Sequence, residues 1–277
     1  MRIMGILNVT PDSFSDGGRY ADVDMAVKCA LEMVKEGAEV IDVGGESTRP
    51  GYTEVSVEEE IARVVPVIRA IREKSDVTIS IDTYKYDVAK AAIEAGADML
   101  NSIWGFVKDE RLAELAAETG VQVVLMHNRD VPFEENGDTE QTGDDLLEGT
   151  LSGADERFMS VVKKELQASL SIAEKYRIEH DKIWLDPGVG FGKTYEQNLA
   201  VIRHVDQLVE MGYPVLMAAS RKSVIGNALD LPVDEREEGT IAISVYAAMK
   251  GCNMVRVHDV EKNARALSML RAISNTR

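Results

Sequence analysis

Short apolar runs and longer amphipathic segments alternate along the whole chain. The first run, residues 3–7, is aliphatic and is bounded by turn-forming residues, which is typical of a strand buried on both faces. A polar loop follows it, and then a segment, 22–37, in which apolar residues recur at helical spacing. The same order is repeated to the end of the chain. Strands are predicted at 3–7, 39–44, 77–81, 99–100, 121–126, 182–185, 214–217 and 253–257.

The pattern predicts eight strands and eight helices in strict alternation. Alternation of this kind indicates a parallel sheet, because right-handed β-α-β crossovers are the available connection. Eight such units can close into a (β/α)8 TIM barrel of the α/β class, and 277 residues suit this barrel as a single domain. The alternative is an open, doubly wound sheet, in which some of the polar strand ends would lie far from the others.

One acidic stretch, residues 130–156, interrupts the alternation and shows no convincing periodicity. A structureless loop beyond about 15 residues is unusual inside a compact domain. We therefore predict a mobile insertion rather than a catalytic lid. A long helix is predicted after it, from about residue 157 to 176, and further helices at 196–211 and 239–250.

Composition narrows the class of protein. Hydrophobic residues make up 45% of the chain and aromatic residues only 5%, which describes a globular protein with an aliphatic core. The net charge of −17 argues against nucleic-acid binding, since such binding depends on clustered Lys and Arg. No stretch predicts a signal peptide or a membrane span. Two cysteines, Cys29 and Cys252, suit small buried positions in a reducing compartment, so a cytoplasmic location is predicted.

Polar residues follow most of the predicted strands. In a closed barrel the carboxyl ends of all eight strands meet at one rim, so polar residues that are far apart in the sequence would converge there. The residues concerned are Asn8, Thr48, Asp82, Asn101, Asp186, Lys222 and His258.

Asp82, Asn101 and Asp186 are each the first polar residue after a strand. Taken singly, each is well explained as a helix cap or a turn former. Together, two carboxylates and an amide suit a ring that presents several N–H donors beside a carbonyl, such as a guanidine-like heterocycle. A metal is the competing use of the carboxylates, but no pair of His at ligand spacing accompanies them, which disfavours a transition metal.

Several cations are also expected at this rim. In so acidic a chain, Arg49 and Arg256 at one rim indicate an anion site and could bind a phosphate, and Asn8 could add an oxygen ligand for Mg²⁺. Arg256 is equally explained as a strand cation paired with a buried carboxylate, and His258 as a histidine whose hydrogen bonds are satisfied. The glycine-rich loop that carries Phe191 does not match a phosphate-binding loop, so Phe191 is predicted to form one wall of the site. Ser223 opens a helix, where it could hold a carboxylate.

Six motifs that span the chain closely resemble those of dihydropteroate synthases. They are residues 4–18, 45–51, 81–83, 185–193, 220–223 and 256–260. The resemblance implies a TIM barrel that condenses 6-hydroxymethyl-7,8-dihydropterin diphosphate with 4-aminobenzoate, giving 7,8-dihydropteroate and diphosphate in folate synthesis. It further implies a homodimer, a requirement for Mg²⁺ and a target of sulfonamides.

Transferred residue by residue, the resemblance assigns each predicted site residue a role. The pterin is assigned to Asp82, Asn101, Asp186, Lys222 and Arg256. The diphosphate is assigned to Asn8, Thr48, Arg256 and His258, with Asn8 also the Mg²⁺ ligand. The aminobenzoate is assigned to Thr48, Arg49, Pro50, Phe191 and Ser223. The catalytic residues would be Asp16, Lys222, Arg256 and His258, with Asp16 and Phe14 on the loop that closes over the reaction.

Two positions depart from the family pattern, which usually has Gly at Ala218 and Asp at Ser102. Two other functions are therefore weighed. Pterin-binding methyltransferases are expected to share the barrel, but a methyl transfer has no diphosphate for the first motif and Lys222 to hold. A barrel that binds pterins without turnover would not need Asn8, Asp16 or His258, all of which are present.

Overall fold

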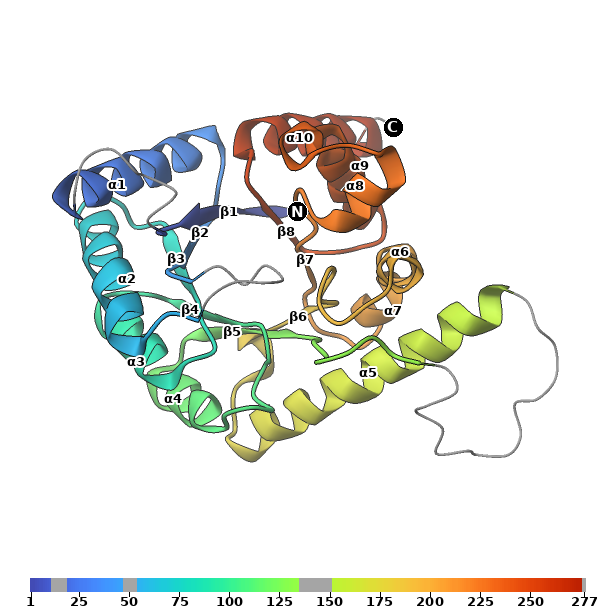
Figure 1. The fold of residues 1–277 in the computed structure, drawn as a ribbon, viewed down its shortest axis with the longest axis horizontal. Coiled ribbons are helices and arrows are strands. Elements are labelled where there is room, and N and C mark those ends of the chain that lie inside the picture. The colour runs from blue at the N-terminus through green and yellow to red at the C-terminus, as the bar shows by residue number, and fades with distance from the viewer. Residues whose placement is uncertain (11–18, 47–53, 135–150, 276–277) are drawn as a thin grey trace.

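The computed structural model describes residues 1–10, 19–46, 54–134 and 151–275. Their strands form one parallel eight-stranded sheet in the order β6-β5-β4-β3-β2-β1-β8-β7, with the helices around its outside (Figure 1). The strands at the two ends of this order meet through a single bridge between Leu185 and Val215, so the sheet is nearly closed. The barrel prediction is confirmed, and the open doubly wound alternative is excluded.

The eight strands follow the predicted order, and helices connect them. The strands are β1 (Arg2–Asn8), β2 (Val40–Gly44), β3 (Thr78–Asp82), β4 (Met99–Ser102), β5 (Gln122–Met126), β6 (Ile183–Asp186), β7 (Leu216–Met217) and β8 (Met254–Val257). The α-helices are α1 (Arg19–Glu36), α2 (Val57–Arg72), α3 (Tyr86–Glu94), α4 (Arg111–Thr119), α5 (Leu151–Lys175), α6 (Tyr195–Arg203), α7 (Asp206–Val209), α8 (Ser223–Leu229), α9 (Glu237–Met249) and α10 (Val260–Asn275). Two short 3₁₀ helices are η2 (His180–Lys182) and η3 (Val233–Glu235).

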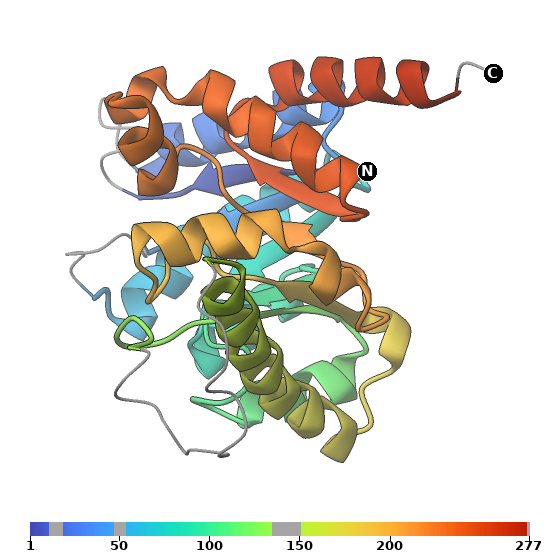
Figure 2. The same ribbon diagram turned by 90° about the vertical axis from the view of Figure 1, so that its right-hand side faces the viewer.

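The described residues form ten α-helices, so the prediction of eight was wrong. The segment predicted as one helix over 196–211 is divided into α6 and α7. At the break the N–H of Gln207 donates to the carbonyl of His204, a tighter turn than the α-helix allows. The connection between β7 and β8 holds two helices, α8 and α9, which Figure 2 shows beside α10.

The helix after the acidic stretch begins earlier than predicted. Helix α5 starts at Leu151 rather than near residue 157, so the helical part of the predicted insertion belongs to α5. The remaining core of that stretch, 135–150, lies outside the described residues, and its predicted mobility stays a prediction.

An apolar layer fills the inside of the barrel beneath the carboxyl rim. Seven of its side chains form one buried cluster: Met4, Val40, Met99, Val124, Trp184, Leu216 and Met254. Each comes from a different strand, as expected where inward-facing positions of a barrel stack in layers. A larger apolar shell packs the outer faces of the strands against the helices.

Candidate active site at the carboxyl rim

A polar layer lies directly above the apolar layer because side chains on a strand return to the same face every second residue. Met254 is followed at that spacing by Arg256, Met99 by Asn101 and Trp184 by Asp186. On β2 the same step leads from Val40 to Asp42. Alternation on the strands thus places charged and amide side chains around one opening at the carboxyl end of the barrel.

Arg256 joins the buried carboxylate of Asp42 to the largely buried carboxylate of Asp82 in this layer. Its Nε donates to Oδ2 of Asp42 at 2.5 Å, and its Nη2 donates to Oδ2 of Asp82 at 2.6 Å. Asn101 Nδ2 also donates to Asp42 Oδ2, at 3.2 Å. Burial lowers the pKa of Arg256, but the two carboxylates more than offset this effect and raise that pKa above its ordinary value. The guanidinium is therefore charged and fixed in orientation.

Asp82 is a strongly perturbed carboxyl. Burial raises its pKa from 3.8 to about 7; Arg256 opposes the rise and the Asp42 carboxylate adds to it. Among the described residues, neither Oδ1 of Asp42 nor Oδ1 of Asp82 has a hydrogen-bond partner, although both atoms are buried. Buried acceptors left unpaired are costly and uncommon, and strongly shifted carboxyls gather at functional sites.

Asp186 and Lys222 form a second charged group beside the first. The Gly188 N–H donates to Asp186 Oδ1 at 2.7 Å, and burial raises the pKa of Asp186 while Lys222 opposes that rise. Burial lowers the pKa of Lys222 to about 8, against the effect of Asp186. Lys222 Nζ donates to the carbonyl of Val189 and lies 4.7 Å from the centre of the Phe191 ring. The predicted wall residue Phe191 therefore lies beside a predicted pterin ligand.

The loop that carries Phe191 is packed tightly against the end of β5. Gly188 has a φ of +67°, and a Cβ there would lie 1.8 Å from the His127 carbonyl oxygen, so only glycine fits. The buried ammonium of Lys193 donates to the carbonyls of Gly188 at 2.8 Å, Phe191 at 2.9 Å and His127 at 3.3 Å. The loop backbone therefore approaches the end of β5 closely.

The remaining described site residues stand on the same rim. His258 follows β8, and its Nδ1 lies 2.9 Å from Ser220 Oγ. Ser223 begins α8, directly after Lys222. Asn8 ends β1, and a Cβ on Gly44 would lie 3.7 Å from Asn8 Oδ1, so the glycine leaves space beside this oxygen.

Five predicted residues lie outside the described part of the chain. They are Phe14, Asp16, Thr48, Arg49 and Pro50. Their assigned roles stay predictions.

Asp42 is the site residue that sequence reasoning missed. It lies within the apolar run of β2 and is fully buried. The available signal was its spacing, because a charge two residues after an inward-facing Val40 occupies the same kind of position as Arg256 after Met254. Such a charge inside a buried strand is rare without a partner.

The described residues also bear on the predictions for the cysteines, for a metal site, for membrane spans and for the two departures from the family pattern. Cys252 is buried and Cys29 half-buried, both as free thiols. In these residues no group of three His, Cys, Asp or Glu is arranged to hold a metal ion. None of the described helices is long and apolar enough to cross a membrane. Ala218 and Ser102, the two departures, are both buried.

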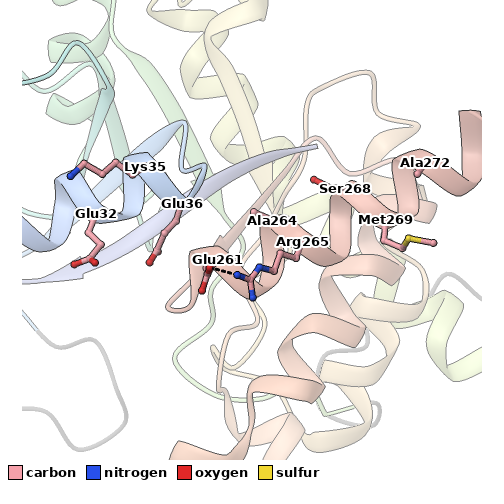
Figure 3. Close-up of a pocket in the computed structure, with 9 residues that line it drawn as sticks. All are labelled: Glu32, Lys35, Glu36, Glu261, Ala264, Arg265, Ser268, Met269 and Ala272. Carbon is pink, nitrogen blue, oxygen red and sulfur yellow. Dashed lines mark hydrogen bonds and ion pairs between the residues drawn. The ribbon is translucent and has the colours of Figure 1, made fainter.

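A groove of about 730 Å³ lies on the outer surface, between α1 and α10 (Figure 3). Its lining consists of helix-surface side chains such as Glu36 and Met269, and the ion pair between Glu261 and Arg265 lies along its α10 side. It contains none of the rim residues, so it is separate from the polar layer inside the barrel.

The family model described as "Pterin binding enzyme" matches residues 4–258. A dihydropteroate synthase from Clostridium beijerinckii is 52% identical over 268 residues, which cover 96% of this chain and 92% of that relative. The chain belongs to the dihydropteroate synthase family. A second member, from Bacillus subtilis, is 48% identical over 99% of this chain and 88% of its own length.

Solved members of the dihydropteroate synthase family share the whole fold. The structure of the Clostridium difficile enzyme in the presence of pteroic acid has a TM-score of 0.88 and 43% identity, covering 99% of this chain and 97% of that one. The Xanthomonas albilineans enzyme with 4-aminobenzoic acid has a TM-score of 0.88 and 37% identity, covering 100% and 94%. The family match includes every rim residue described above.

Proposed function

We propose that this rim catalyses the dihydropteroate synthase reaction, in which 4-aminobenzoate displaces diphosphate from 6-hydroxymethyl-7,8-dihydropterin diphosphate. The observation that carries the proposal is the polar layer in which Arg256 joins Asp42 and Asp82 beside Asp186 and Lys222. Solved relatives that contain pteroic acid, 4-aminobenzoic acid or 7,8-dihydropteroate support the choice of substrates.

The carboxylates and the lysine suit the polar edge of a pterin. Asp82 and Asp186 accept hydrogen bonds from the ring N–H and amino groups, and Lys222 donates to the ring carbonyl. Asn101 supplies an amide that can both donate and accept. These groups lie at the mouth of an apolar barrel, where hydrogen bonds to charged groups are strengthened because water is excluded.

Arg256 and His258 serve the departing diphosphate. As the C–O bond breaks, its electron pair leaves with the diphosphate, and the fixed guanidinium stabilises the charge that develops. Early cleavage leaves a cation that the pterin ring stabilises. The amine of 4-aminobenzoate then attacks that carbon, the C–N bond forms, and the amine loses a proton. We place Asp16 near this positive charge and the aminobenzoate against Phe191 and Ser223, with Thr48, Arg49 and Pro50.

Asp42 acts through Arg256 rather than on the substrate. Its Oδ2 accepts from both Arg256 Nε and Asn101 Nδ2, so it holds two proposed pterin ligands in register. We assign it a positioning role for that reason.

Mg²⁺ is the proposed metal. Asn8 Oδ1, at the end of β1, would supply one neutral oxygen, which suits an ion that prefers few protein ligands and takes the others from phosphates and water. Bound Mg²⁺ would help to neutralise the diphosphate. Assembly as a homodimer and a cytoplasmic location stay proposals drawn from the resemblance and the composition.

The test is diphosphate release by the purified protein given the pterin diphosphate and Mg²⁺, with and without 4-aminobenzoate. We expect aminobenzoate-dependent release together with 7,8-dihydropteroate. Arg256→Gln should lower kcat/KM by about 100-fold or more, since removing one preorganised donor to a developing negative charge typically costs about 10²–10³ in rate. Arg265→Gln, which breaks an exposed pair with Glu261 on α10, is the matched control and should be near wild type. Release without dihydropteroate, or pterin binding without release, would refute the proposal.

A further inference from the structure

Arg221 has an unusual backbone conformation at a sensitive place. Its φ is +56°, a left-handed value that residues with a side chain rarely adopt. Among the described residues, two others besides glycines share it: Arg177, which follows α5, and Asp230, which ends α8. A left-handed residue is ordinary where a helix ends. Arg221 follows no helix, and it lies between Ser220 and Lys222.

Because Arg221 is left-handed, the side chains of its two neighbours, Ser220 and Lys222, point to different sides. In an extended segment, residues two apart point to the same side. Here Ser220 Oγ faces β8, where it accepts from the backbone N–H of His258 at 3.2 Å. Lys222 instead reaches the loop after β6 and donates to the Val189 carbonyl. The turn at Arg221 lets Ser220 and Lys222, two residues apart, contact two different parts of the rim.

Contacts from the start of α9 hold this turn from outside the pocket. The Arg221 N–H donates to Thr240 Oγ1 at 3.1 Å, and the Arg221 carbonyl accepts from Arg236 Nη1 at 3.1 Å. Arg221 Nε donates to Glu237 Oε2, also at 3.1 Å. Both backbone polar groups and the side chain of one residue are thus bound by a single turn.

Glu237 links this turn to a further helix. Its side chain is buried, and its Oε1 accepts from Asn263 Nδ2 on α10 at 3.0 Å. Glu237 thus contacts Arg221 directly. Asn263 Nδ2 also donates to the Asp259 carbonyl at 2.8 Å, so α10 links Glu237 to the residue after His258 as well.

We propose that Glu237, with Arg236 and Thr240, is a positioning residue that keeps Arg221 left-handed and thereby aims Ser220 at His258 and Lys222 into the pocket. The inference rests on the proposed function. It adds the first turn of α9 to the determinants of the reaction, although none of its residues belongs to the polar layer.

The test compares Arg221→Ala with Arg221→Gly. Both variants lose the side-chain contact to Glu237, but glycine adopts positive φ without strain, whereas alanine keeps the strain. We expect kcat/KM for the pterin diphosphate to fall on the order of 10-fold to 100-fold in Arg221→Ala and clearly less in Arg221→Gly. Glu237→Gln should weaken the same parameter, and the pH–rate profile should shift because Lys222 changes its surroundings.

Arg177→Ala and Arg177→Gly are the matched controls, because Arg177 has φ of +60° on an exposed turn after α5. Both should change only the melting temperature. Equal kinetics for Arg221→Ala and Arg221→Gly, or wild-type kinetics and an unshifted pH profile for Glu237→Gln, would overturn the inference. If the wild type does not turn over, the proposed function fails, and the affinities of Arg221→Ala and Arg221→Gly for the pterin diphosphate are compared by calorimetry instead. The inference on Arg221 is thus tested separately from the proposed function.

Discussion

Asp82→Asn should make the protein more stable at alkaline pH while removing its affinity for the pterin. Burial raises the pKa of Asp82 from 3.8 to about 7. Below pH 3.8 this carboxyl is protonated in both the folded and the unfolded protein, and its burial costs no ionisation energy. As the pH rises through 7 the buried group must ionise, and the free energy of unfolding falls. The difference between the two values corresponds to about 4 kcal/mol at pH 8. Asparagine carries no charge to bury.

The pH dependence gives the more reliable measure, because it cancels the change in hydrogen bonding to Arg256. Ionisation of Asp82 lowers the free energy of unfolding of the wild type by roughly 4 kcal/mol in all. About 2 kcal/mol of this is lost between pH 3.8 and pH 5.5, and the rest by pH 8. The free energy of unfolding of Asp82→Asn should therefore gain about 2 kcal/mol on that of the wild type between pH 5.5 and pH 8. Urea unfolding followed by the fluorescence of the buried Trp184 measures this difference.

Asp109→Asn is the control. The hydrogen bond from Arg111 lowers the pKa of Asp109, so this carboxyl is ionised at both pH values and its replacement should cost the same at each. A stability difference between Asp82→Asn and the wild type that stays constant from pH 5.5 to pH 8 would refute the account of Asp82 as a strained, buried acid. Retention of pterin binding by this variant would refute its role as a ligand.

Two further predictions concern the packing of β5 against the loop after β6. Burial lowers the pKa of His127 to about 4, so the neutral imidazole stabilises the fold above pH 6.5, and this stabilisation is lost as the pH falls to 4. Acidification from pH 7 to pH 4.5 should therefore lower the free energy of unfolding of the wild type by about 2 kcal/mol more than that of His127→Gln. Urea unfolding at both pH values measures this difference. Gly188→Ala should cost more than about 3 kcal/mol or give insoluble protein, whereas Gly120→Ala, with φ of +69° and nothing within 4 Å of its Cβ, should cost only about 1 kcal/mol in the same assay.

The barrel was predictable because its two signals are local. Apolar runs and helical periodicity depend on neighbouring residues, and strict alternation leaves few topologies. The weakness of the closure between β6 and β7 was not visible, since a single bridge at Leu185 and Val215 leaves no pattern in the sequence. The divided helix after β6 was missed for the same reason, because its apolar spacing continues across the break.

The site was predictable at strand ends and less so within strands. Asp82 and Asp186 end their strands, where a polar residue after an apolar run is easily seen. Asp42 stands inside a buried strand, and only its partner Arg256, 214 positions away along the chain, explains it. The buried ammonium of Lys193 was also unforeseen, since its acceptors are backbone carbonyls that leave no trace in residue type.

The single bridge between β6 and β7 makes this seam the weakest line in the barrel wall. Asp186 ends the strand on one side of the seam, and Lys222 follows the strand on the other. A ligand bound by both side chains would connect the end of β6 to the end of β7. Substrate binding and closure of the barrel wall would then occur together, and β6 and β7 would be less firmly held to each other in the enzyme without ligand.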